Sequence, residues 1–194
     1  IFNGNGYTDE WIEEAEKRGL YNLKTTPDAL PHFVDEKNIA LFTKHGIFTK
    51  EELFSRYEIW LENYYKTINI ESNTLAEIIQ KQVIPSVFTY VEKLADTAAV
   101  KKSVVADVSV AIEAALISKL STLADTMTKD LETLKADTAK ALAASDDVLA
   151  CAKAYQETVL EDMDTLRKSA DEAEALIPDE LLPYPTYDEL LFSI

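Results

Sequence analysis

The feature that most constrains this fold is a long run of apolar residues at helical spacing between residues 49 and 94. Thr49 followed three residues later by Glu52 predicts a capping box, in which each side chain bonds an unpaired backbone N–H at a helix start. After it, large side chains recur at steps of three and four, which places them on one helical face. The pattern predicts one long helix over residues 49–94, straight or kinked, that continues through Pro85. Its face holds Leu53, Tyr57, Trp60, Leu61, Tyr64, Ile68, Leu75, Ile78, Ile79, Val87, Tyr90, Val91 and Leu94.

Two more apolar stripes follow in the second half of the chain. One runs from Val104 to Leu142 and the other from Leu149 to Leu176. The polar residues 144–147 predict a turn between them, and residues 95–100 are the expected break after the first long helix. Long helices joined by short turns pack antiparallel. We therefore expect an all-α fold, in which long antiparallel helices form a bundle with a projecting helical hairpin.

Both ends of the chain predict smaller elements. Short helices are expected after three capping residues, which are Thr8, Thr26 and Asp35. The last segment holds three prolines and a Thr186–Glu189 capping box, so we expect an extended tail that finishes in one helical turn. The predicted organisation is short helices over residues 1–48, a long-helix bundle and hairpin over residues 49–177, and a tail over residues 178–194.

Charge and cysteine content limit the partners and the compartment. The chain carries 35 acidic and 19 basic residues, a net charge of −16. Such a surface repels phosphate backbones and anionic lipid, so we expect neither a nucleic-acid nor a membrane partner. Cys151 is the single cysteine, which allows no intrachain disulfide and fits a cytoplasmic location. It lies in an apolar run and is expected to be a small buried residue.

The residues that usually carry catalysis or hold a metal are scarce. His32 and His45 are the two histidines, and neither has a carboxylate three residues before it, so a di-iron bundle of the Glu-x-x-His kind is excluded. A zinc site rich in histidine or cysteine is excluded by the same count. Clustered acidic residues occupy adjacent helical positions and are expected on solvated faces. We predict no catalytic, cofactor-binding or metal-binding residue in this chain.

Glu71 interrupts the apolar stripe of the long helix, between Ile70 and Leu75. Two interpretations stay open. Either the stripe drifts around the helix and Glu71 is exposed, or Glu71 is a buried or half-buried carboxylate that pairs with a Lys, Arg or Tyr from another helix and fixes the register.

Three segments resemble the C-terminal region of type III glutamine synthetases. Residues 64–71, YYKTINIE, and residues 84–87, IPSV, are similar to the helix that shows "INIEALTM…ILPAV" in that family. Residues 183–192, PYPTYDELLF, are similar to its terminal "PFPTYGDLLF". Residues 3–11, NGNGYTDEW, are similar to "NGYSEEW". The sequence departs from the family pattern at Ser72, Asn73 and Asp188, and residues 97–160 match only as helix.

The resemblance implies that this chain is part of a longer enzyme, an ATP-dependent glutamate–ammonia ligase that uses Mg or Mn and assembles from hexameric rings. Its catalytic barrel is expected upstream of Ile1, and the start of the chain, which lacks Met, fits that expectation. The fragment is expected to be inactive alone, to pack residues 1–48 against the catalytic domain, and to serve a structural or assembly role in a homo-oligomer. The candidate structural and interface residues are Trp60, Tyr64, Glu71, Tyr184, Pro185, Tyr187 and Phe192. The alternative is a free-standing helical module that binds a protein partner.

Overall fold

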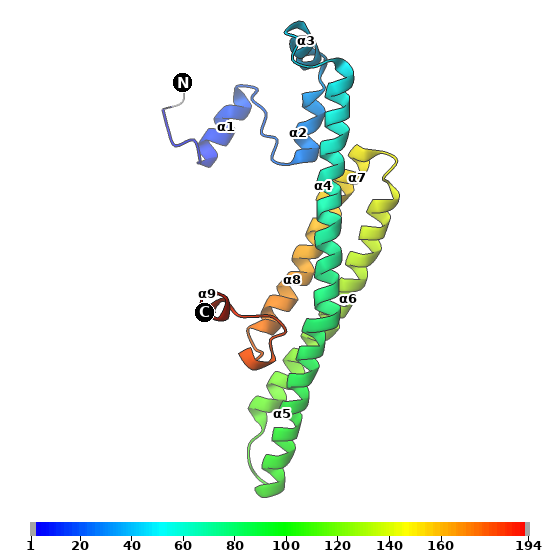
Figure 1. Cartoon of the computed structure of the whole chain (residues 1–194). Coiled ribbons are helices and arrows are strands. Elements are labelled where there is room, and N and C mark those ends of the chain that lie inside the picture. The colour runs from blue at the N-terminus through cyan, green and yellow to red at the C-terminus, as the bar shows by residue number, and fades with distance from the viewer. Residues whose placement is uncertain (1–2, 193–194) are drawn as a thin grey trace. The chain divides into compact units, whose positions relative to one another are not determined.

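The structure, a computed structural model, describes residues 3–192, and within this range it is helical with no β-strand (Figure 1). The predicted all-α class is confirmed. Two compact units divide between Tyr64 and Tyr65, inside one helix. The predicted division of the chain after residues 48 and 177 stays a prediction. The first and last predicted segments include residues 1, 2, 193 and 194, which lie outside the described range.

The first unit holds three short helices and the start of a long one: α1 (Asp9–Lys17), α2 (Thr26–Phe33), α3 (Glu36–Lys44) and α4 (Lys50–Ile78). The N-cap of α2 is Thr25, whose hydroxyl accepts the Asp28 N–H at 3.4 Å, and not Thr26 as predicted. The shift has a simple reason: Thr26 and Pro27 are already helical, because proline fits the first turn. Thr8 and Asp35 occupy N-cap positions, but their side chains bond outside the helix start.

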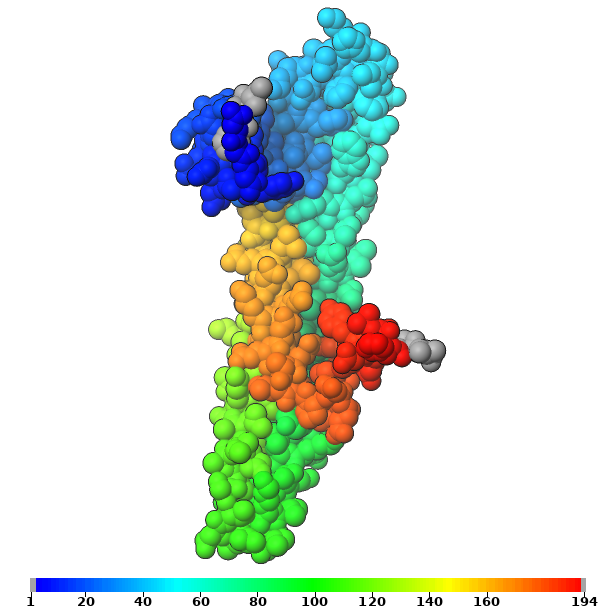
Figure 2. All heavy atoms as spheres, turned by 90° about the vertical axis from the view of Figure 1, so that its left-hand side faces the viewer, coloured from blue at the N-terminus to red at the C-terminus, as the bar shows by residue number. Residues whose placement is uncertain are grey.

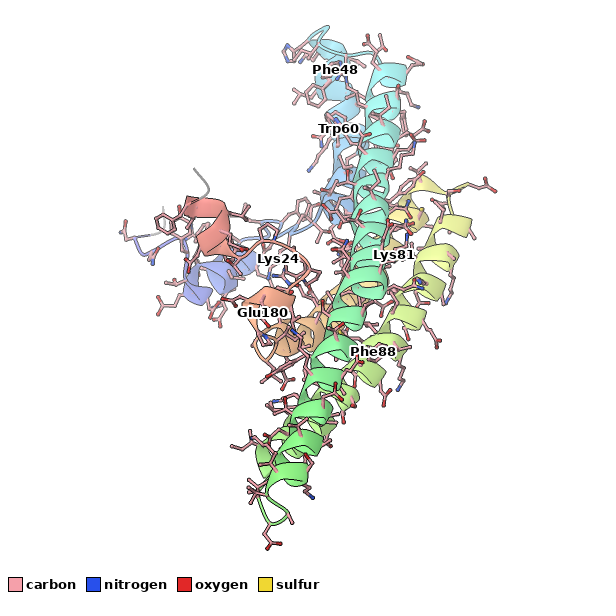
Figure 3. All side chains as sticks on the ribbon, turned by 60° about the horizontal axis from the view of Figure 1, so that its bottom comes forward. Lys24, Phe48, Trp60, Lys81, Phe88 and Glu180 are labelled. Atoms are coloured by element: carbon pink, nitrogen blue, oxygen red, sulfur yellow. The ribbon has the colours of Figure 1, made fainter. Side chains whose placement is uncertain are left out.

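Aromatic packing holds the first unit together. Phe33 of α2 packs on Phe42 of α3 and on Trp60 of α4, with ring centroids 5.8 and 5.1 Å apart. Phe48 joins Phe42 at 5.7 Å and lies under the guanidinium of Arg56. Phe48 and Trp60 are labelled in Figure 3. The cluster joins α2, α3 and α4, because Phe33 of α2 contacts one ring on each of the other two helices.

The predicted capping box opens α4. Thr49 N–H donates to Glu52 Oε2 at 2.8 Å, and Glu52 N–H donates to Thr49 Oγ1 at 3.2 Å. Gly46, just before it, has a φ of 64°, the left-handed conformation in which glycine ends a helix without steric cost. The end of α3 and the start of α4 are therefore both set by local sequence.

The long helix is longer than predicted. After α4 a π-helical turn, η1 (Ile79–Val83), leads directly into α5 (Ile84–Val104), and all three are continuous. The predicted break at residues 95–100 is wrong. This alanine-rich stretch holds neither Gly nor Pro, so nothing in it stops a helix. The chain leaves the helix only at Val105.

The π turn explains how the helix passes Pro85. A proline lacks its N–H and its ring clashes with the carbonyl four residues before it, which is Lys81 here. Lys81 lies inside η1, where the backbone is wider and the hydrogen bonds skip one more residue. The helix therefore continues through Pro85 instead of ending there.

In the second unit, α6 (Ala111–Ala143) packs against α5 and against α7 (Val148–Ala154), η2 (Tyr155–Val159) and α8 (Leu160–Glu174). Figure 1 shows α6 and α8 as long helices beside the continuous helix of α4 and α5. The turn at residues 144–147 is confirmed, and Asp147 caps α7 through the Ala150 N–H at 3.0 Å. A second turn at residues 105–110 was not predicted. Val104 is the last residue of α5 and Val108 lies in this turn, so neither belongs to the second helical stripe, which begins with α6. Buried residues of that stripe are Leu120, Leu123, Met127, Leu131, Leu134 and Thr138.

The third stripe supplies the other side of this core. Tyr155, Val159, Leu166 and Ala173 are buried. Cys151 is also buried, as predicted, and its thiol donates to the carbonyl oxygen of Ala141 at 3.3 Å. The tail follows as a 3₁₀ turn, η3 (Asp179–Leu181), and α9 (Tyr187–Phe192). The final capping box is also confirmed, since Thr186 N–H donates to Glu189 Oε2 at 2.8 Å.

Candidate functional site

Metal-binding groups and membrane-spanning helices were both predicted to be absent, and the described residues can be searched for each. Among residues 3–192, no three His, Cys, Asp or Glu side chains are placed to hold a metal ion, and no helix is long and apolar enough to cross a membrane. His32 stacks on Tyr21 at 4.5 Å and contacts Asp35 Oδ2 at 3.1 Å, and His45 caps the end of α3. The candidate site is a surface on the tail, where large apolar side chains are exposed.

The tail is fastened to α5 before it reaches α9. The hydroxyl of Ser86 donates to the carbonyl oxygen of Leu181 at 2.8 Å. Lys93 Nζ pairs with Glu180 Oε1 at 3.2 Å, and both of these side chains are well exposed, so the ion pair adds little energy. Ser86 therefore provides the specific anchor.

A groove lies between the end of α8 and the tail. Tyr184, Thr186 and Leu190 line one side, and Asp171 and Glu174 line the other. Burial, and then the nearby carboxylate of Asp171, raise the pKa of Glu174, while Arg167 opposes the rise. The groove is thus mainly apolar with an acidic edge.

Large apolar side chains of α9 are exposed among the described residues. Tyr187 is 84% exposed, Leu191 74% and Phe192 75%, and Leu190 is also exposed. Of the predicted tail residues, Tyr184 is half-buried in the groove, Pro185 and Tyr187 line the groove but are exposed, and Phe192 is exposed. Four large apolar side chains on a six-residue helix form an apolar patch of the kind that marks a docking surface.

The remaining predicted candidates lie on α4, on both sides of the division between units. Trp60 is 41% exposed although it packs on Phe33, and Tyr64 is half-buried. Burial, followed by the nearby Asp28, raises the pKa of Tyr64. Glu71 is exposed, so the interpretation of a buried carboxylate is wrong in this chain. Its neighbour Ser72, only 1% exposed, is the polar residue on the inward face.

Ser72 belongs to a buried polar cluster that the stripe pattern did not reveal. Thr138 Oγ1 lies 3.4 Å from Ser72 Oγ, and the Tyr155 hydroxyl donates to Asn69 Oδ1 at 2.9 Å. The ring of Tyr155 stacks on Tyr65 with centroids 5.8 Å apart. Three helical segments, α4, α6 and η2, thus meet at side chains from residues 69–72.

The first half of the chain, which includes α4, matches a known protein family. The family model of the glutamine synthetase C-terminal domain matches residues 1–102 of the chain. The chain belongs to this family.

Curated relatives extend the likeness over the whole chain. A glutamine synthetase of Butyrivibrio fibrisolvens is 51% identical over all 194 residues, and these make up 28% of that protein. A type-3 glutamine synthetase of Dictyostelium discoideum is 32% identical over 99% of the chain and 26% of its own length. A glutamine synthetase of Bacteroides fragilis is 31% identical over 27% of its length. The chain thus spans about a quarter of the length of the relatives it matches.

The structure gives physical roles to the motifs that resemble this glutamine synthetase domain. In INIE, Ile68 is buried and Asn69 accepts the hydrogen bond of Tyr155. In IPSV, Val87 is buried and Ser86 holds the tail. Sequence analysis missed the roles of Asn69 and Ser86, because their partners lie 86 and 95 residues away along the chain.

Proposed function

We propose that this chain is a structural and assembly domain of a glutamine synthetase, an enzyme that joins ammonia to glutamate with ATP. The observation that carries the proposal is the family match over residues 1–102, together with 51% identity to a glutamine synthetase more than three times as long. In this proposal the catalytic residues, the ATP site and the Mg or Mn ions belong to the rest of the protein, and the enzyme is a cytoplasmic homo-oligomer.

The proposed task of the tail is to dock on the catalytic domain of the same protein. Its support is the contrast within a few residues of chain: Ser86 fixes the tail at Leu181, and α9 then turns an apolar face outward. A surface that is both anchored and apolar loses little conformational entropy on docking, because its backbone is already ordered.

The first test measures chemistry. The intact protein is expected to release phosphate from ATP only when glutamate, ammonia and Mg or Mn are all present. The 194-residue chain by itself is expected to show no turnover under the same conditions. Turnover by the chain alone would overturn the assignment of the chemistry to the rest of the protein.

The second test measures docking. In the intact protein, the double change Leu191→Asp and Phe192→Asp is expected to lower the thermal stability of the catalytic part, because it places charge on the apolar face of α9. Phe88→Asp is the matched control, since Phe88 is an aromatic side chain 59% exposed on α5 (Figure 3). Equal effects of the two variants would count against a specific docking role for α9.

A further inference from the structure

The end of the second unit where α5 turns into α6 carries a second apolar surface, distinct from the tail. We call it the hairpin tip, defined by Val100, Val104, Val105 and Ile112. These side chains are 62%, 78%, 55% and 75% exposed. In Figure 2 the tip is the green end of the unit, with none of the tail or α8 over it on that face.

The tip is a fixed surface and not a loose loop. Lys101 of α5 bonds Glu113 of α6 across the base of the turn, and Glu113 is only 6% exposed. The hydrogen bond from Lys101 holds the pKa of the Glu113 carboxyl below its usual range, so this carboxylate stays charged at neutral pH. Inside the turn, Val105 N–H donates to Lys101 O at 3.0 Å, and Val108 N–H donates to Val105 O at 3.1 Å. The two helix ends therefore present the apolar side chains on an ordered backbone.

Single exposed apolar residues are common and need no explanation, but four at the two helix ends and the turn between them form a patch. The sequence could have placed Lys or Glu at these positions without loss of packing, since none of the four is buried. A binding role explains why β-branched apolar residues stand there instead.

The charges around the tip indicate what it meets. The chain as a whole has a net charge of −16, so two copies repel one another over most of their surface. Residues 99–114 carry no net charge, because two lysines are balanced by two acidic residues. Lys101 and Glu113 pair with each other, which leaves Lys102 and Asp107 exposed beside the patch and without an ion pair among the described residues.

One cation and one anion beside an apolar patch are self-complementary. In a two-fold contact between identical tips, Lys102 of each copy can face Asp107 of the other copy, so two ion pairs form. We infer that the hairpin tip is a self-association surface that meets the tip of a second copy of this chain. The inference deepens the assembly role proposed above and rests on it only in requiring several copies of the protein.

The size of the tip sets the strength of the contact. Four side chains bury far less than the roughly 1,000 Å² of a stable interface, so the contact is weak in isolation. Its effect grows when other contacts hold several copies together, because the second contact then forms at high effective concentration.

The experiment uses the intact protein with the photo-reactive residue p-benzoylphenylalanine at position 105. Lys102 and Lys119 flank the tip with no Lys or Arg between them, so trypsin releases residues 103–119 as one peptide. A crosslink that joins two of these peptides comes only from two copies of the protein. The matched position is Ser145, in the exposed turn at the other end of α6.

The tip position is expected to give crosslinks between two 103–119 peptides, with a yield about tenfold above self-crosslinking at position 145. Adding Val104→Asp or Ile112→Asp is expected to remove that excess. Leu142→Asp, a change of an exposed apolar residue at the far end of α6, is expected to keep it. Circular dichroism checks that each variant folds, which the exposure of these residues favours.

Charge reversal tests the two-fold geometry. Because these changes remove the trypsin site at 102 and add one at 107, the yield is measured here as crosslinked dimer on a denaturing gel. Lys102→Glu alone is expected to lower this yield, and Lys102→Glu with Asp107→Lys is expected to restore it. A yield at position 105 no higher than at 145, crosslinks to another segment or another protein, or no restoration by the double reversal would each overturn the inference. Failure of the ligase assay would overturn the proposed chemistry and leave this result standing.

Discussion

The hydroxyl of Tyr155 donates a hydrogen bond to Oδ1 of Asn69 at 2.9 Å, across 86 residues of sequence. The bond joins the π turn η2 to α4 inside the second unit. The same hydroxyl lies 3.5 Å from the carbonyl oxygen of Thr138 on α6. The phenol of Tyr155 thus reaches two other helices, α4 and α6.

Tyr155→Phe tests this bond. The ring still fills its site, so we expect a loss of about 1 kcal/mol in the free energy of unfolding, the net value of one such hydrogen bond. Asn69→Ala on its own and the double variant complete a thermodynamic cycle by urea unfolding. Strictly additive effects would show that the two side chains are not coupled.

The same tyrosine predicts a response to alkaline pH. Burial first, and then Cys151 and Tyr65, raise the pKa of Tyr155 to about 12. The unfolded chain releases this proton near pH 10, whereas the folded chain retains it. The contribution of the neutral phenol to the free energy of unfolding is therefore fully present below pH 10 and falls as the pH rises toward 12. The loss is expected to be smaller in Tyr155→Phe, measured as the midpoint of urea unfolding from pH 9 to 12. Parallel curves for the two proteins would contradict the assignment.

Asp162 predicts a variant that stabilises the fold. Its Oδ2 is shielded from solvent and has no hydrogen-bond partner among the described residues. Burial, and then the carboxylate of Asp137, raise the pKa of Asp162. Because burial penalises the charged form of Asp162, the neutral side chain in Asp162→Asn is expected to increase the melting temperature at pH 7. The gain should vanish as the pH falls below about 4, where wild-type Asp162 is neutral in both states. Asp164→Asn, at an exposed position of the same helix, is the control.

Glu71 and Ser72 predict opposite sensitivities at neighbouring positions. Glu71 is exposed, so Glu71→Gln should change the free energy of unfolding by less than about 0.5 kcal/mol. Ser72 is 1% exposed and its hydroxyl bonds Asn69 O at 3.1 Å. Ser72→Val adds volume to a packed site and should cost about 1–3 kcal/mol. A large loss for Glu71→Gln would revive the buried-carboxylate interpretation.

The helix ends were predictable where the signal is local. The Thr49–Glu52 and Thr186–Glu189 boxes form as expected, because capping involves residues three apart. The end of α5 was not predictable in the same way. Residues 95–100 looked like a break from composition, but alanine continues a helix, and the turn came at residues 105–110 instead.

The candidate surface was predicted in part. Tyr187 and Phe192 were expected at an interface, and both are exposed on the described chain. Their role as an interface stays a prediction. The hairpin tip escaped notice because its valines fit a helical stripe equally well, and periodicity does not tell which end of a helix lacks a neighbour.

The sequence by itself determined the all-α class, the two capping boxes, the turn at residues 144–147 and the family resemblance, because these depend on residues close together along the chain. The tertiary structure decided which polar residues of the long helix face inward and which apolar residues stay uncovered. Ser72 and not Glu71 lies inside, and Ser86 holds the tail, because helical period fixes a face but only the neighbouring helices determine whether that face is buried.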